Sequence, residues 1–132
     1  MRLVILESPF RGRTLEETAR NKRYAETCML DSLRRGESPL ASHLLWPGIL
    51  DDADPAERQA GIAAGLAWGQ VAHATVVYVD FGISEGMAQG IRRAQAEGRP
   101  VEYRCWKEKG ATEAAPSQEN APMHAIAAQA AE

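Results

Sequence analysis

The stretch that decides the fold is TVVYVD at residues 75–80, an almost unbroken run of β-branched and aromatic side chains. A run of this kind is typical of a central parallel strand, because such a strand is buried on both faces and needs no polar alternation. The FGI turn at residues 81–83 ends it. We therefore expect an α/β fold with this strand in the interior of a parallel sheet.

The rest of the chain alternates between strand and helix patterns on either side of this run. Further strands are expected over residues 2–6, 39–45 and 100–103, the second of them ending near His43. Helices are expected over residues 14–35, 55–72 and 84–98, each beginning at a capping side chain: Thr14, Asp54 or Ser84. The order βαβαβαβ implies right-handed crossovers and hence a flavodoxin-like or Rossmann-like doubly wound sheet, in the strand order 2-1-3-4.

Two of the expected helices carry informative spacings. In residues 14–35 the apolar positions at helical spacing, which we expect in the core, are Ala25, Cys28, Met29 and Leu33. In residues 55–72 glycines recur every four residues, at Gly61, Gly65 and Gly69. A glycine stripe lets another segment approach closely, and we favour tight packing on the sheet or on a partner helix over contact with a ligand.

Composition narrows the class of protein. The 132 residues, 45% hydrophobic and 25% charged, suit one soluble domain that folds without a disulfide or structural metal. A net charge of -3 argues against nucleic acid as a partner. Because no apolar run is long enough for a membrane span or a signal peptide, we expect no membrane partner and a cytoplasmic location.

Cys28 and Cys105 are isolated thiols, so neither a metal site nor a cofactor is expected from them. We divide the chain into an α/β domain at residues 1–106 and a tail at residues 107–132, which is rich in Ala, Glu and Gln and is expected to be mobile.

In the order 2-1-3-4 a ligand crevice is expected beyond the carboxyl ends of strands one and three. The loop SPFRGR at residues 8–13 lies there, just before a helix N-terminus, and offers Ser8, Arg11 and Gly12 to a phosphate or carboxylate. A solvated basic turn is the alternative, and the coincidence with the crevice favours the ligand. After strand three, Gly82 and Gly86 bring backbone close to a ligand and Ser84 adds a donor.

Aromatic and imidazole side chains fall near the same crevice. Phe10 and Phe81, both in crevice loops, are candidates for stacking on a planar base. His43 fits a structural and a ligand-binding role equally well. Trp46 and Trp68 are interpreted as core or oligomer contacts.

Four motifs in this order carry a resemblance to a known family: LESPFRG at residues 6–12, ASHL at 41–44, DFGISEGM at 80–87 and GRPV at 98–101. Together they make residues 2–104 resemble the nucleoside 2-deoxyribosyltransferase-like superfamily, in particular its small bacterial and phage branch of domains of unknown function. The resemblance implies a flavodoxin-like sheet, a homo-oligomer (dimer or tetramer) and a crevice that holds a nucleoside or nucleotide.

The active relatives attack the anomeric carbon of the sugar with a glutamate from the helix after strand three, as retaining glycosidases do. That position falls on Gly90 here, and a second acidic position known in some relatives falls near Gly65. The resemblance therefore favours a binding protein for a nucleoside, nucleotide or nucleotide-derived signal, without the usual glycosyl transfer.

Two alternatives stay open. The first is an N-glycosidase or deoxyribosyltransferase with a relocated catalytic carboxylate, for which Glu7 and Asp80 are the candidates at the strand ends and Glu85 begins the following helix. The second is a structural or partner-binding module whose glycine-striped helix forms an interface.

Overall fold

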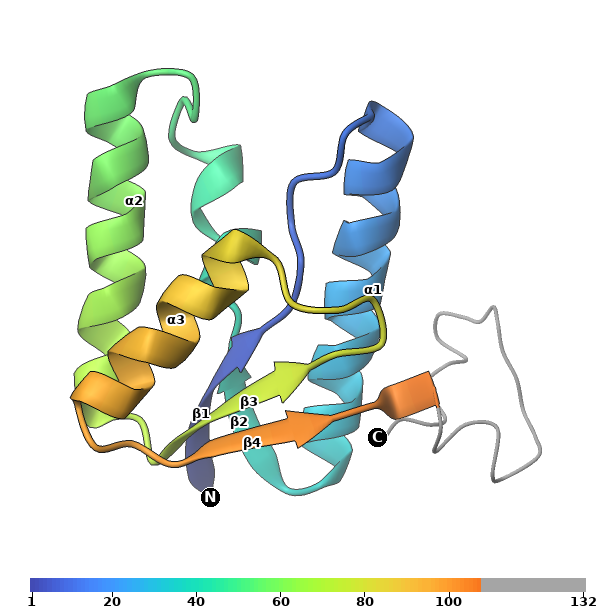
Figure 1. Ribbon diagram of the computed structural model, residues 1–132, viewed down its shortest axis with the longest axis vertical. Helices are drawn as coiled ribbons and strands as arrows, with labels where there is room; N and C mark the ends of the chain where they lie inside the picture. Colours follow the sequence, from blue (N-terminus) through green and yellow to red (C-terminus); the bar gives the residue numbers. More distant parts are fainter. Residues whose placement is uncertain (108–132) are drawn as a thin grey trace.

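The computed structural model describes residues 1–107 and holds a four-stranded parallel sheet in the order β2-β1-β3-β4 (Figure 1). Its strands are β1 (Arg2–Glu7), β2 (Glu37–Leu40), β3 (Ala74–Tyr78) and β4 (Val101–Arg104). The helices between them are α1 (Leu15–Arg34), α2 (Pro55–Trp68) and α3 (Glu85–Ala96). The doubly wound α/β fold and its strand order, which is that of flavodoxin-like proteins, are thereby confirmed. The expected tail lies almost wholly outside the described residues.

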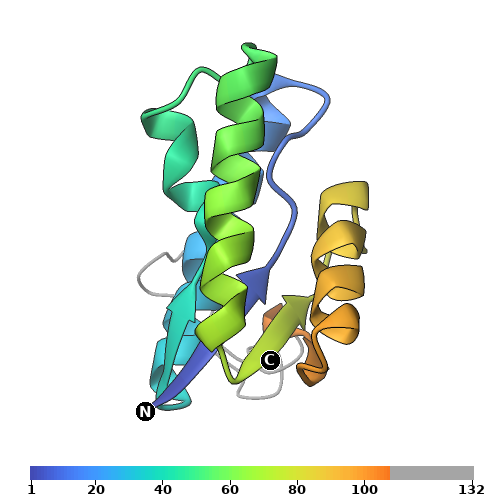
Figure 2. The same ribbon diagram turned by 90° about the vertical axis from the view of Figure 1, so that its left-hand side faces the viewer.

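The helices cover the sheet from both sides, α1 on one face and α2 and α3 on the other (Figures 1 and 2). Every residue of β3 is buried, as its sequence predicts. The cluster on the α1 face is made of Val4, Leu6, Tyr24, Cys28, Ala41, Ala74, Val76 and Tyr78. A smaller cluster on the α3 face is made of Val77, Met87 and Ile91. Burial of these apolar side chains is the main source of the fold's stability.

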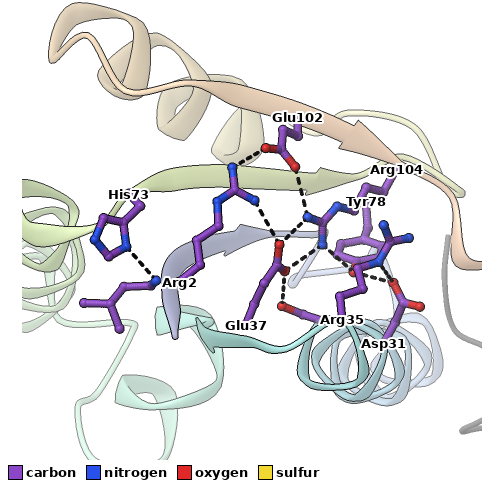
Figure 3. Close-up of polar contacts among 10 residues, drawn as sticks. Arg2, Asp31, Arg35, Glu37, His73, Tyr78, Glu102 and Arg104 are labelled. Carbon is purple, nitrogen blue, oxygen red and sulfur yellow. Dashed lines mark hydrogen bonds and ion pairs between the residues drawn. The ribbon is translucent and has the colours of Figure 1, made fainter.

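An ion network joins the strands on the α1 face (Figure 3). Arg104 of β4 holds the carboxylate of Glu37 at the start of β2 through two contacts, of 2.6 and 2.9 Å, and Ser32 of α1 donates to it at 2.7 Å. Arg2 of β1 bridges Glu37 and Glu102. Burial by itself raises the pKa of Glu37, but the hydrogen bonds from Arg104 and Ser32 outweigh it and lower the pKa to about 2.

The second strand differs from its prediction. It spans Glu37–Leu40 rather than residues 39–45, and two short 3-10 helices follow, η1 (Ser42–Leu44) and η2 (Trp46–Gly48). The chain leaves the sheet because the amides of Leu44 and Leu45 bond back to the carbonyls of Ala41 and Ser42 instead of to a strand. His43 consequently lies in η1 and not at a strand end.

Two helix predictions also change in detail. The second helix ends at Trp68, and the short helix η3 (Gly69–Val71) takes up the rest of its predicted span. Leu33 is 52% exposed rather than in the core, because Asp31 and Ser32 complete the buried stripe of α1 and serve the ion network. None of the helices in residues 1–107 is long and apolar enough to cross a membrane.

Candidate functional site

A cavity of about 750 Å³ opens at the carboxyl end of β1 on the face that carries α2 and α3. Its floor is Ile5 and Glu7 of β1, and its walls come from the loop after β1, from η1 and η2, and from the facing sides of α2 and α3. This volume lies within the range of small-molecule sites, and the position is where doubly wound sheets bind ligands.

The cavity exists because α2 packs on side chains of the preceding loop. A Cβ on Gly65 would lie 2.8 Å from Ser42 Oγ, and one on Gly61 would lie 3.5 Å from Trp46 Cβ. A Cβ on Gly69 would lie 2.9 Å from Arg99. The nearest neighbours of the glycine stripe are therefore Ser42 of η1, Trp46 of η2 and Arg99 rather than strand residues, and its three glycines also line the cavity.

Glu7 fills the space that a side chain at position 90 would occupy. A Cβ built on Gly90 of α3 would overlap the carboxyl group of Glu7, with Oε1 only 3.0 Å away. The absence of a side chain at Gly90 thus lets the carboxyl of Glu7 rest against the backbone of α3. The carboxyl group of Glu7, from β1, therefore lies where the first side-chain carbon of a residue at position 90 of α3 would lie.

Burial raises the pKa of Glu7 to about 8, and the positive charge of Arg99 opposes this only in part. Arg99 is engaged elsewhere: it donates to Thr75 Oγ1 at 3.0 Å, to the carbonyl of Gly69 and to Glu97 at 2.6 Å. At neutral pH Glu7 is therefore mainly a neutral carboxylic acid.

Ser8 and His43 form a hydrogen-bonded pair beside Glu7, with 2.8 Å between Oγ and Nε2. Burial lowers the pKa of His43 to about 4, because desolvation disfavours the imidazolium. The ring of Phe10 meets the imidazole edge-on at a centroid distance of 6.2 Å. Ser8, His43 and Phe10 therefore add neutral polar and aromatic groups to the cavity wall, beside the buried guanidinium of Arg99.

Arginines line the outer part of the cavity, and their side chains are largely exposed. Each has an acidic neighbour: Arg11 and Arg58 lie beside Asp52, Arg92 beside Glu85 and Arg93 beside Glu97. Glu57 accepts from the amide of Asp51 at 2.6 Å. Exposed ion pairs are worth little, so an anionic ligand can compete for these guanidinium groups at small cost.

The cavity gathers many of the residues predicted for the site. Glu7 and six of the predicted ligand-binding residues line it, namely Ser8, Phe10, Arg11, His43, Ser84 and Gly86. Ser84 also caps α3 by accepting from the amide of Met87 at 3.3 Å. The loop after β1 and the start of α3 thus face one space.

Asp80 and Phe81 do not line the cavity, because the chain leaves β3 toward α1. The carboxylate of Asp80 accepts from the hydroxyl of Tyr24 at 2.5 Å and from the amides of Trp106 and Lys107. Phe81 packs on Tyr24 at a centroid distance of 4.5 Å. Asp80 holds the end of β4 and has no access to a ligand in the cavity.

Gly12 and Gly82 also lie outside the cavity lining, and both have backbone roles. Gly82 turns the chain with φ of 85°, a conformation that favours glycine. A Cβ on Gly12 would overlap Glu17 of α1.

Sequence reasoning missed three groups at this site. Arg99 is part of the GRPV motif, yet nothing local indicates that its guanidinium reaches the cavity. Ser42 and Trp46 contact the glycines of α2, and the indole Nε1 of Trp46 is buried with no hydrogen-bond partner among residues 1–107. The spacing of the glycines was a usable signal for this packing, although it does not say which side chains fill it. No cluster of three or more His, Cys, Asp or Glu side chains in that part of the chain is placed to hold a metal.

The chain belongs to the family described as a domain of unknown function (DUF7768), whose match covers residues 2–104. All of the cavity-lining residues fall within that span. No curated protein matches the chain.

Proposed function

We propose that this member of the DUF7768 family binds a nucleoside, nucleotide or nucleotide-derived signal in the cavity between α2 and α3. The observation that carries the proposal is the cavity itself: about 750 Å³ at the carboxyl end of β1, lined by Phe10 and neutral polar groups, by buried Arg99 and by four exposed arginines. A flat heterocycle suits the inner part, and phosphate suits the exposed guanidinium groups. The resemblance to nucleoside 2-deoxyribosyltransferase-like proteins supports the same ligand class.

Within this proposal Phe10 packs on the base, and Ser8, Arg11 and Ser84 contact sugar or phosphate. Arg11 is 60% exposed and needs only to leave Asp52 to meet an anion. The usual glycosyl transfer is not expected, because Gly90 supplies no carboxylate from α3.

Calorimetric titration with a panel of nucleosides and nucleotides tests the proposal. We expect binding of at least one of them, and a loss of at least tenfold in affinity for Ile62→Trp, since Ile62 lines the cavity and a larger side chain fills it. The matched control is Leu33→Trp, an exposed position on α1 that is not part of the cavity. No heat of binding from any member of the panel at about millimolar concentration would overturn the proposal.

A second candidate is glycosyl transfer by Glu7, and the overlap between its carboxyl group and the side-chain space of Gly90 favours it. In that reaction the ionised form of Glu7 attacks the anomeric carbon: a C–O bond forms, the C–N bond breaks, and the leaving base takes a proton from solvent water. Water or a second base then releases the sugar from Glu7.

Chromatography of free base after incubation with nucleosides tests this candidate. This candidate predicts that Glu7→Gln abolishes the release of base, because the amide cannot form the covalent bond to the sugar. Asp80→Asn serves as the control, since Asp80 lies outside the cavity. Base release at an unchanged rate in Glu7→Gln excludes Glu7 as the nucleophile.

We also propose that the chain forms a homo-oligomer, either a dimer or a tetramer, because the same resemblance implies one. Light scattering on the purified chain tests it, and a monomer at all concentrations contradicts it.

A further inference from the structure

No residue among those that the structure describes donates a hydrogen bond to the carboxyl of Glu7, although the group is partly buried and lines the cavity. An ionised carboxylate in such a place normally receives several donors, because its desolvation is otherwise costly. We therefore expect this carboxyl group either to stay protonated or to form its hydrogen bonds with a ligand.

The charged groups around Glu7 do not supply that partner. Arg99, whose side chain is 7% exposed, has its guanidinium bound to Thr75, Gly69 and Glu97. The other titratable groups that line the cavity have the partners within the chain that are described above: Arg11, His43, Asp52, Glu57, Arg58, Arg92 and Arg93.

We propose that Glu7 recognises the heterocyclic base of the ligand as a neutral carboxylic acid, donating through its O–H and accepting through its C=O. The inference rests on the proposed function and adds the orientation of the bound ligand, with its base at Glu7. A neutral carboxylic acid presents one donor beside one acceptor, which matches the base edges that show a ring nitrogen or carbonyl beside an N–H. A phosphate is mainly a dianion at neutral pH and offers acceptors only, so it cannot donate to the C=O of Glu7.

The surroundings of Glu7 agree with this assignment. Burial raises its pKa to about 8, so the O–H is present at neutral pH. Ile5, two residues before Glu7 on β1, lines the same cavity and suits the face of a planar base.

Titration calorimetry with AMP, GMP, CMP and UMP at about pH 7 and about pH 9 tests the inference. For the tightest binder we expect wild-type affinity to fall about tenfold between these pH values, because Glu7 loses its proton. Glu7→Gln keeps one donor and one acceptor but does not titrate, so it should bind within about threefold of wild type at pH 7 and show no such pH dependence. Glu7→Leu keeps neither and should lose at least about tenfold.

Ribose 5-phosphate is the control, since it carries sugar and phosphate without a base. Its binding should not respond to either substitution. Three results would each overturn the inference and leave the proposed function standing. The first is that Glu7→Gln binds no better than Glu7→Leu, and the second is that wild-type affinity is constant with pH. The third is that ribose 5-phosphate shows the same pH dependence as the nucleotide. If none of the four binds, the same series is run on the tightest binder of the wider panel of nucleosides and nucleotides. Absence of binding by the whole panel would overturn the proposed function, and this inference with it.

Discussion

At the scale of single residues, Glu7 depends on Gly90, because the carboxyl group of Glu7 occupies the space that a side chain at position 90 would need. The residue patterns identify each of them separately, Glu7 as a carboxylate at a strand end and Gly90 as a helix position without a side chain. Their overlap depends on how closely α3 approaches β1, which is a tertiary distance that no local pattern encodes. Arg99 was missed for the same reason. It lies in the loop before β4, and only the tertiary structure brings its side chain to the cavity.

Glu7 and His43 predict an unusual dependence of stability on pH. The raised pKa of Glu7 means that its contribution is lost as pH rises from 4.5 to about 8, and the lowered pKa of His43 means that its contribution is lost as pH falls from 6.5 to about 4. The two slopes oppose each other between 4.5 and 6.5. Above 6.5 only that of Glu7 remains, at up to about 1.4 kcal/mol per pH unit.

We therefore expect the free energy of unfolding to fall by about 2 kcal/mol between pH 6.5 and 8, measured by urea denaturation without ligand. Glu7→Gln should remove that slope. An equal slope in wild type and Glu7→Gln would show that Glu7 is ionised throughout.

At the scale of elements, residues 75–80 predicted β3 to within two residues at either end. The prediction worked because a strand buried on both faces consists almost entirely of β-branched and aromatic residues. The prediction for residues 39–45 failed because β2 is a short edge strand, whose few apolar residues do not distinguish it from the 3-10 turns that follow. That difference moved His43 into η1, where it meets Ser8.

The packing of α2 gives a prediction at this scale. Gly65→Leu forces a Cβ to within 2.9 Å of Ser42 Cβ, and overpacking of this kind costs about 1–3 kcal/mol. Ala63→Leu, at an exposed position of the same helix, should cost less than about 0.5 kcal/mol. Urea midpoints measure both variants.

The loss in Gly65→Leu should be the same at every protein concentration, because the stripe packs within the chain. A loss that disappears at high concentration would instead indicate an interface between chains.

At the scale of the whole molecule, the alternating strand and helix patterns and the handedness of crossovers predicted a doubly wound parallel sheet, and the order 2-1-3-4 was taken from the flavodoxin-like fold. The ion network on the α1 face was not predictable, because Glu37 lies far from Glu102 and Arg104 in the sequence and each has the spacing of an ordinary surface charge. The sheet order predicted where the cavity lies but not how wide it is. Its width depends on how closely α2 packs against Ser42 and Trp46.

The network predicts how the sheet responds to loss of one charge. Glu37→Gln leaves the guanidinium of Arg104 buried and poorly paired, and should lower the free energy of unfolding by about 3–5 kcal/mol. Glu102→Gln, whose side chain is 38% exposed, should cost less than about 1 kcal/mol. Equal losses in thermal or urea denaturation would contradict the assignment.

The lowered pKa of Glu37 adds a dependence on acid. Its contribution is complete above pH 4.5 and is lost as pH falls toward about 2, so wild type should lose more stability over this range than Glu37→Gln does.

The most direct test of the central claim is native mass spectrometry of the purified chain with mixed nucleosides and nucleotides, together with analysis of the solution for free base. The proposed function predicts one intact nucleoside or nucleotide retained per chain by wild type and none by Ile62→Trp, with no free base released. A wild-type chain that retains nothing at about millimolar ligand would contradict it.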